Sequence, residues 1–119
     1  MHENNFEEKV KVSENISIRV DMDKQLIDLY FKDELIALNF YRFTSHESVV
    51  SKFARMTQEN ILVFICQITD EAFPPVTRVI KPVREKANLL RFELMNEFQN
   101  ILRLIQKVEQ KYNLYLSMK

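Results

Sequence analysis

The feature that most constrains the fold is an uninterrupted helical pattern at the C-terminal end of the sequence. Pro82 suits the first turn of a helix, and neither glycine nor proline occurs after it. After Pro82, apolar residues recur at intervals of four and three, a spacing that places them on one face of a helix. The residues are Leu94, Phe98, Ile101, Ile105, Val108, Tyr112 and Tyr115. The sequence therefore predicts a long C-terminal helix over residues 83–116.

Such a helix is longer than the domain that carries it. About 34 residues at 1.5 Å each span roughly 50 Å, whereas a compact domain of 119 residues has a diameter of about 35 Å. Either the helix breaks near Asn113 or bends across the sheet and stays within its own chain, or its far end packs on another copy. We expect a homodimer, because each large apolar side chain left in water forgoes about 1.5–3 kcal/mol. The candidate self-association residues are Val108, Tyr112, Tyr115 and Leu116.

The segment before residue 44 has the pattern of an antiparallel sheet. Residues 16–22 alternate between apolar and polar, and two aromatic-rich segments follow after Asp23-Lys24 and Lys32-Asp33. This predicts a three-stranded meander over 16–43 with tight turns. A helix over 24–39 also fits the spacing of several apolar residues. We favour strands because of the aromatic content and the alternation just upstream.

The middle of the chain completes an α+β domain. The sequence Thr-Ser-His-Glu at 44–47 matches a capping box and predicts a short helix over 45–58. The continuous apolar run over 61–69 predicts a fourth strand covered on both faces. The Pro74-Pro75 pair requires a loop, and residues 77–80 are expected to form a short edge strand.

The predicted domain organisation is simple. Residues 1–13 are polar with mixed charge and are expected to form a flexible N-terminal arm. Residues 14–119 are expected to form a single α+β domain. No apolar run approaches the ~18 residues that span a bilayer, and the N-terminal residues lack the pattern of a signal peptide. We therefore expect a cytoplasmic protein without a membrane partner.

The residue types present argue against common catalytic machinery. Glycine is absent, which excludes glycine-rich phosphate loops, dinucleotide-binding fingerprints and the nucleophile elbow as motifs. Cys66 is the one cysteine, so the chain has no internal disulfide and no zinc-ligand set. His46 has no second histidine nearby in the sequence. We expect no enzyme, no cofactor and no metal site.

Charge is unevenly distributed along the chain. Residues 1–48 hold ten acidic and six basic side chains, whereas residues 49–119 hold seven acidic and eleven basic ones. The densest basic segment precedes and opens the long helix, where backbone N–H groups also attract anions. Its candidate phosphate-binding or nucleic-acid-binding residues are Arg78, Lys81, Arg84, Lys86 and Arg91. Tyr30 and Tyr41 are candidate base-stacking residues on the sheet.

Two functional hypotheses follow. The first is a small non-enzymatic interaction protein, such as a regulator, adaptor or inhibitor, that presents a surface to a protein partner and forms a homodimer through its C-terminal helix. The alternative is a nucleic-acid-binding module that uses the basic segment over 78–91 and the sheet aromatics. The glycine-free composition also fits a phage or mobile-element product.

Overall fold

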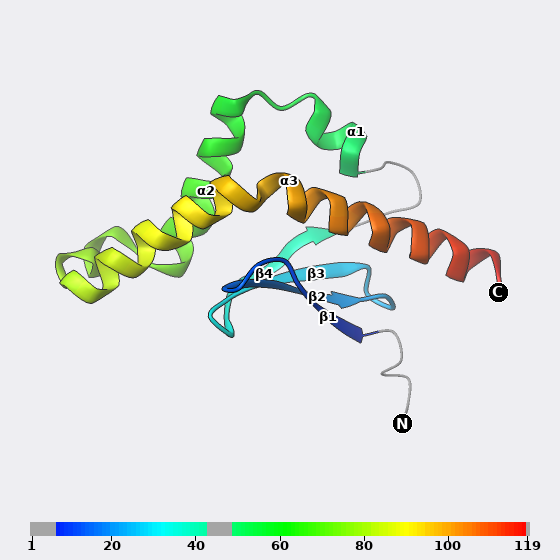
Figure 1. The fold of residues 1–119 in the computed structure, drawn as a ribbon, viewed down its shortest axis with the longest axis horizontal. Helices are drawn as coiled ribbons and strands as arrows, with labels where there is room; N and C mark the ends of the chain where they lie inside the picture. Colours follow the sequence, from blue (N-terminus) through cyan, green and yellow to red (C-terminus); the bar gives the residue numbers. More distant parts are fainter. Residues whose placement is uncertain (1–6, 43–48, 119) are drawn as a thin grey trace.

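The chain folds into a four-stranded antiparallel sheet with its helices on one face. The computed structural model describes residues 7–42 and 49–118. The sheet has the order β1-β2-β3-β4, formed by Glu7–Lys11, Ile16–Asp21, Leu26–Phe31 and Glu34–Arg42. The helical elements are α1 (Val49–Ala54), α2 (Gln58–Ala72), the 3-10 helix η2 (Pro75–Val79) and α3 (Lys81–Ser117). Figure 1 shows α3 lying along the sheet, with α2 beside its first half. This is the α+β arrangement that the sequence predicts.

The predicted meander is confirmed as strands β2, β3 and β4, which excludes a helix over 24–39. The β3–β4 connection is the Lys32-Asp33 turn, and both residues have positive φ angles, 52° and 65°. Glycine or asparagine usually occupies such positions, because a side chain crowds the left-handed backbone. This chain has no glycine, so lysine and aspartate adopt that conformation here.

Strand β1 corrects part of the predicted flexible arm over residues 1–13, namely residues 7–11. Glu7–Lys11 pairs antiparallel with β2, so that Val10 lies opposite Ile18. The sequence pattern missed this strand because the segment is mostly charged. Charged side chains are common on edge strands, where they discourage pairing with other chains.

Helix α2 corrects the prediction of a strand over 61–69. Thr57 caps its start, since the Thr57 hydroxyl accepts a hydrogen bond from the backbone N–H of Asn60 at 3.1 Å. Ile65, Ile68 and Thr69 are buried on one face, whereas Leu62 and Val63 are exposed. A short apolar run does not distinguish a strand from a helix, and here the run is helical with two apolar residues facing outward.

The segments on either side of α2 also differ from the prediction. The expected helix over 45–58 is shorter, because α1 ends at Ala54 and α2 begins separately at Gln58. The expected edge strand over 77–80 is not formed: residues 77–79 belong to η2, which starts at Pro75 with a proline in its first turn, and Ile80 is its C-cap. The capping box at 44–47 and both histidines lie outside the described residues.

Helix α3 is confirmed and continuous, with 37 residues and no break at Asn113. It runs along the longest dimension of the molecule, whose extents are 51 × 37 × 22 Å. Contacts with the sheet reach far along it. Lys86 pairs with Glu34 at one end of the sheet, and the Tyr41 hydroxyl donates to Glu109 Oε2 at 3.3 Å near the other. The sheet therefore lies under most of α3, and both ends of the helix extend beyond it.

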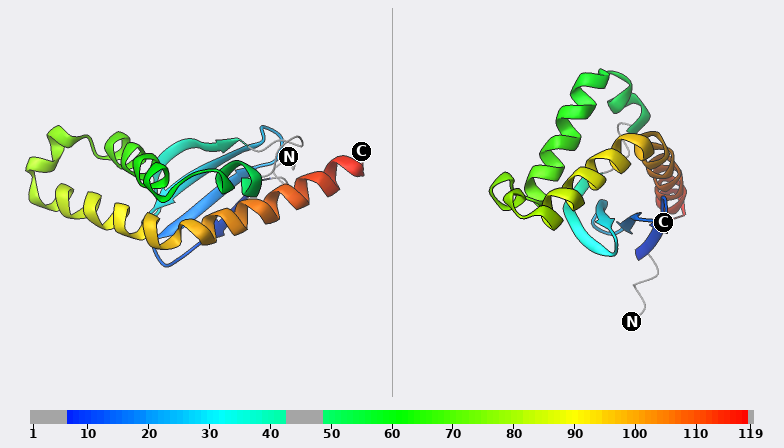
Figure 2. Two further views of the ribbon diagram at one scale, coloured as in Figure 1. Left: turned by 90° about the horizontal axis from the view of Figure 1, so that it is seen from above. Right: turned by 60° about the vertical axis from the view of Figure 1, so that its left-hand side comes forward.

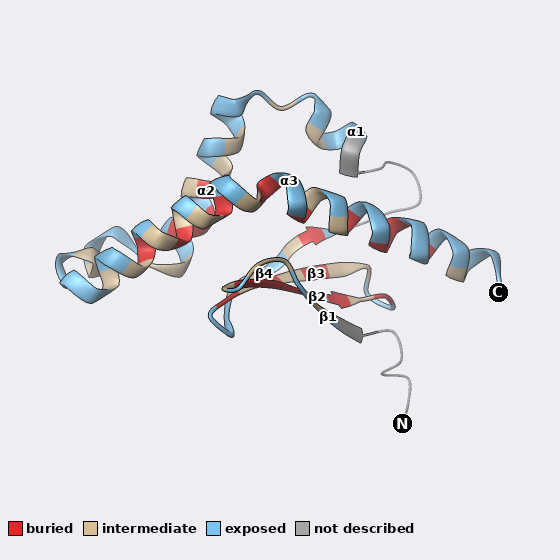
Figure 3. Ribbon diagram, in the orientation of Figure 1, coloured by how far each residue is buried: buried red, intermediate tan, exposed pale blue. Residues whose placement is uncertain are grey.

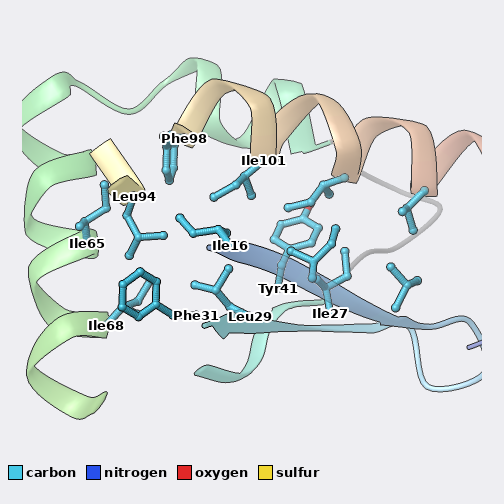
Figure 4. Close-up of a cluster of buried hydrophobic side chains, with 14 of the residues drawn as sticks. Ile16, Ile27, Leu29, Phe31, Tyr41, Ile65, Ile68, Leu94, Phe98 and Ile101 are labelled. Carbon is cyan, nitrogen blue, oxygen red and sulfur yellow. The ribbon is translucent and has the colours of Figure 1, made fainter. Parts of the chain in front are cut away.

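The hydrophobic core fills the space between the inner sheet face and the buried stripe of α3. Figure 4 shows Leu94 beside Ile65 and Phe31, with Ile101 above Ile16. Figure 3 shows the buried residues of α3 on the side that faces the sheet. The fully buried side chains include Ile16, Ile18, Ile27, Leu29, Phe31, Ile65, Leu90, Leu94, Ile101 and Ile105.

An aromatic cluster joins the three helices at the edge of this core. The Phe98 ring of α3 lies 5.6 Å from the ring of Phe53 and 6.5 Å from that of Phe64, both edge to face. Phe40 of β4 lies 5.7 Å from Phe64. Edge-to-face pairs of this kind add about 0.5–1.5 kcal/mol each to the area they bury. The cluster therefore fixes how the helical hairpin of α2 and α3 sits on the sheet.

Candidate functional site

The structure separates the basic residues predicted to bind phosphate. Arg78 is mostly buried, and its guanidinium donates to the Phe73 carbonyl at 2.8 Å and to the Asp70 carboxylate at 2.6 Å. These contacts connect η2 to the end of α2. Arg78 therefore stabilises the turn of the helical hairpin.

The other four basic residues do not form one cluster; three of them have contacts of their own. Lys86 forms an ion pair with Glu34 of β4 at 2.5 Å and lies 5.8 Å from the centre of the Phe73 ring. Arg91 donates to the Asn88 side chain at 2.9 Å. Arg84 donates to the Arg78 carbonyl at 3.1 Å, and Lys81 is exposed. Most of the predicted cationic segment therefore serves local structure.

The two candidate stacking tyrosines lie in different environments. Tyr41 is only 5% exposed, faces the core and donates to Glu109, so it is not accessible to a base. Tyr30 is half-buried on the opposite sheet face, where the Lys9 ammonium lies 4.8 Å from the centre of its ring. The prediction of an accessible tyrosine is wrong for Tyr41.

The four candidate self-association residues also divide. Val108 and Tyr112 are 5% and 8% exposed, and both belong to the core of their own chain. They are not available to a second copy. Tyr115 is half-buried against Tyr112, whereas Leu116 is 38% exposed near the end of α3. The apolar stripe is therefore satisfied within the chain almost to the C-terminal turn.

The tip of the helical hairpin exposes an apolar surface that the sequence pattern did not predict. We call Val76, Val79 and Ile80 the tip triad. Their side chains are 78%, 79% and 56% exposed. Val76 and Val79 are three residues apart in η2 and therefore lie on one side of a 3-10 helix. Figure 2 shows this tip at the end of the molecule farthest from the C-terminus.

The backbone beneath the tip triad is held by many local contacts. All three prolines of the chain, Pro74, Pro75 and Pro82, lie within this segment. The Thr77 hydroxyl donates to the Pro74 carbonyl at 2.6 Å, and the Ile80 N–H donates to the Thr77 carbonyl at 3.2 Å. Phe73 is partly buried and packs against the core, so it contributes less to the exposed surface than the tip triad does.

The acidic side chains and the cysteine of the described residues are spread over the fold. No group of three or more His, Cys, Asp or Glu side chains within them could hold a metal ion. The aspartates near the sheet turns have structural partners. Asp21 accepts from the Lys24 N–H at 3.1 Å, and Asp28 accepts from the Asn39 N–H at 2.8 Å. Cys66 is a half-buried free thiol.

None of the helices in the described part of the chain has both the length and the apolar character needed to cross a bilayer. Comparison with known proteins gives no match to any family model, curated protein or solved structure.

Proposed function

We propose that this chain is a non-enzymatic interaction protein that binds another protein through the tip triad. The exposure of Val76, Val79 and Ile80 on a firmly held segment supports this proposal. Each aliphatic side chain gains about 1.5–3 kcal/mol when it is fully buried. A surface whose backbone is already ordered also loses little conformational entropy when it binds.

The size of the tip indicates the kind of partner. A stable protein interface uses about 20–30 residues on each side, whereas the segment that carries the tip triad is much smaller. It therefore suits insertion into an apolar groove of a larger protein better than a flat symmetric contact. Lys81 and Arg84 are exposed directly beside the triad. We infer that the partner's groove has acidic residues at its rim.

Charging the tip triad should abolish binding without unfolding the chain. The variant is Val79→Glu with Ile80→Glu, and the control is Val63→Glu, which alters a valine that is 52% exposed on α2 of the same hairpin. We expect at least about a tenfold loss of the retained partner for the double variant and no loss for the control, because one buried charge costs more than ~1.4 kcal/mol. Quantitative mass spectrometry of proteins retained on immobilised chains measures this.

Two results would contradict this proposal. One is a set of retained proteins that is the same for the wild type and the double variant. The other is a partner lost equally with Val63→Glu, which would place the contact elsewhere on the hairpin. Circular dichroism of each variant confirms that the helices are intact before the comparison is made.

Self-association through the end of α3 is a second candidate, now confined to its last turns. Leu114, Leu116 and Met118 are 62%, 38% and 79% exposed, where the helix extends beyond the sheet. If these residues form a symmetric contact, light scattering should give twice the 14.3 kDa of one chain. Leu114→Glu with Met118→Glu should then return the mass to one chain. A monomeric wild type at high concentration eliminates this candidate.

A further inference from the structure

The outer face of the sheet carries a pocket that involves neither the hairpin tip nor the end of α3. All helices lie on the other face (Figure 1). Cross-strand pairing places Lys11, Ser17 and Tyr30 in one row across β1, β2 and β3 on the outer face. At the end of this row lies a pocket of about 300 Å³. We call it the sheet-end pocket, and it is lined chiefly by three lysines, two serines and an asparagine.

The topology assembles this pocket from distant parts of the sequence. Lys9 and Lys11 come from β1, and Lys32 comes from the β3–β4 turn. The Lys32 N–H donates to the Asn15 carbonyl at 2.7 Å, which fixes the β3–β4 turn against the β1–β2 connection. The Asn15 side chain donates to Glu93 Oε2 at 2.8 Å and so anchors the connection to α3. The pocket wall is therefore held in place.

Several residues with hydrogen-bond donors line this pocket. Ser17 lines it and is only 8% exposed. Ser13 Oγ accepts from the Ile16 N–H at 3.3 Å, so its own O–H remains able to donate. The backbone N–H groups of Glu14 and Asn15 donate to no backbone carbonyl among the described residues. Backbone N–H groups that are not engaged in the sheet can donate to an anion.

The charges around the pocket favour a small anion. The Lys9 ammonium is held 3.3 Å from the Asp33 carboxylate and 4.8 Å from the centre of the Tyr30 ring. Lys11 and Lys32 are exposed. Glu14 and Asp33 are the two carboxylates of the pocket, so the three lysines give it a net positive charge. An anion that enters it would replace Asp33 as one neighbour of Lys9.

We propose that the sheet-end pocket binds a phosphate monoester. Lysine ammonium groups act as point charges toward phosphate oxygens, and hydroxyl and N–H donors complete their hydrogen bonding. The pocket has room for a phosphate and a small attached group, not for a long polymer. The phosphate belongs either to a small phosphorylated molecule or to the 5′ end of a nucleic acid. This site is independent of the hairpin tip, and its test does not involve the proposed protein partner.

Titration of the full chain with inorganic phosphate and with adenosine 5′-monophosphate, followed by NMR of the backbone amides, tests the proposal. The amides of residues 13–17 and 32–33 should shift and saturate. Lys11→Gln with Lys32→Gln should weaken binding at least about tenfold, because each charge-assisted hydrogen bond contributes more than ~1.4 kcal/mol. The matched control, Lys24→Gln with Lys107→Gln, removes the same charge outside the pocket and should weaken binding less than about twofold.

A second comparison distinguishes the two sources of phosphate. An eight-residue thymidine oligonucleotide is titrated with and without a 5′-phosphate. Tighter binding of the phosphorylated oligonucleotide than of the mononucleotide assigns the site to a nucleic-acid end, and equal binding assigns it to small phosphorylated molecules. Equal binding of the two oligonucleotides overturns the proposal. So does the absence of saturable shifts at 13–17 and 32–33, or an equal loss in the pocket variant and the lysine control.

Discussion

A chain that carries Val108→Glu is expected to lose most of its stability. Val108 is 5% exposed in the core between α3 and the sheet. A carboxylate placed there would lie among apolar side chains. An unpaired buried charge together with the lost apolar contacts costs about 4 kcal/mol or more, against a total of about 5–15 kcal/mol for a typical domain. The melting temperature should fall by roughly 15–30 °C. Thermal unfolding followed by circular dichroism measures this fall.

The matched control for this prediction is Val63→Glu, the same change at a valine that is 52% exposed on α2. Its melting temperature should stay within a few degrees of the wild type, because substitutions at exposed positions alter stability by about 0.5 kcal/mol or less. A different pattern would refute the packing described above. If Val108→Glu melts like the wild type and changes only the mass in solution, then the end of the stripe contacts another chain.

The sequence predicts where the long helix begins and ends, but it does not predict which part of the helix the sheet covers. Its spacing pattern and the absence of glycine and proline after Pro82 define one continuous helix. The position of the sheet beneath it is a tertiary property. We predict self-association from Val108 onward, but Tyr41 of the sheet contacts Glu109 of α3, and Val108 and Tyr112 are both buried within the chain. Comparing the length of the helix with the diameter of the domain therefore predicts that part of the helix extends beyond the sheet. It does not predict which residues that part contains.

Most of the strands that were predicted correctly have a clear sequence pattern. Strands β2 and β3 largely alternate because one sheet face is buried and the other is open, whereas β4 does not alternate. Strand β1 is an edge strand with four charged residues out of five and has almost no such signal. The prediction of a strand over 61–69 was wrong because a strand buried on both faces and a helix with extra exposed apolar residues have the same composition. The Thr57 cap was the signal that favoured a helix.

The candidate sites were harder to predict than the fold. A basic segment is visible in sequence, but Arg78 and Lys86 form ion pairs with Asp70 and Glu34 that depend on the tertiary fold. The sheet-end pocket draws its lysines from β1 and from the β3–β4 turn, so no spacing rule joins them. The tip triad lacked a pattern for another reason. Valine and isoleucine are commonly buried, and their exposure in η2 becomes visible only in the folded chain.

The Phe98→Ala variant should lose about 3–5 kcal/mol, the usual cost of removing a buried phenylalanine. Phe98 is 3% exposed, and its ring contacts those of Phe53 and Phe64 edge to face. The loss should act first on the attachment of α2, because this cluster joins α2 to α3 whereas Leu94 and Ile101 still join α3 to the sheet. Hydrogen exchange should therefore accelerate more at the amides of α2 than at those of β2 and β3.

Phe92→Ala provides the control, because Phe92 belongs to the same helix and is 63% exposed. Its free energy of unfolding, measured in urea, should change by about 0.5 kcal/mol or less. Equal losses in the two variants would show that Phe98 is not the buried residue of the pair. Faster exchange in the sheet, with α2 unchanged, would mean that α2 does not depend on this cluster for its position. Either result contradicts the helical hairpin as the support of the tip triad, since α2 and α3 hold η2 between them.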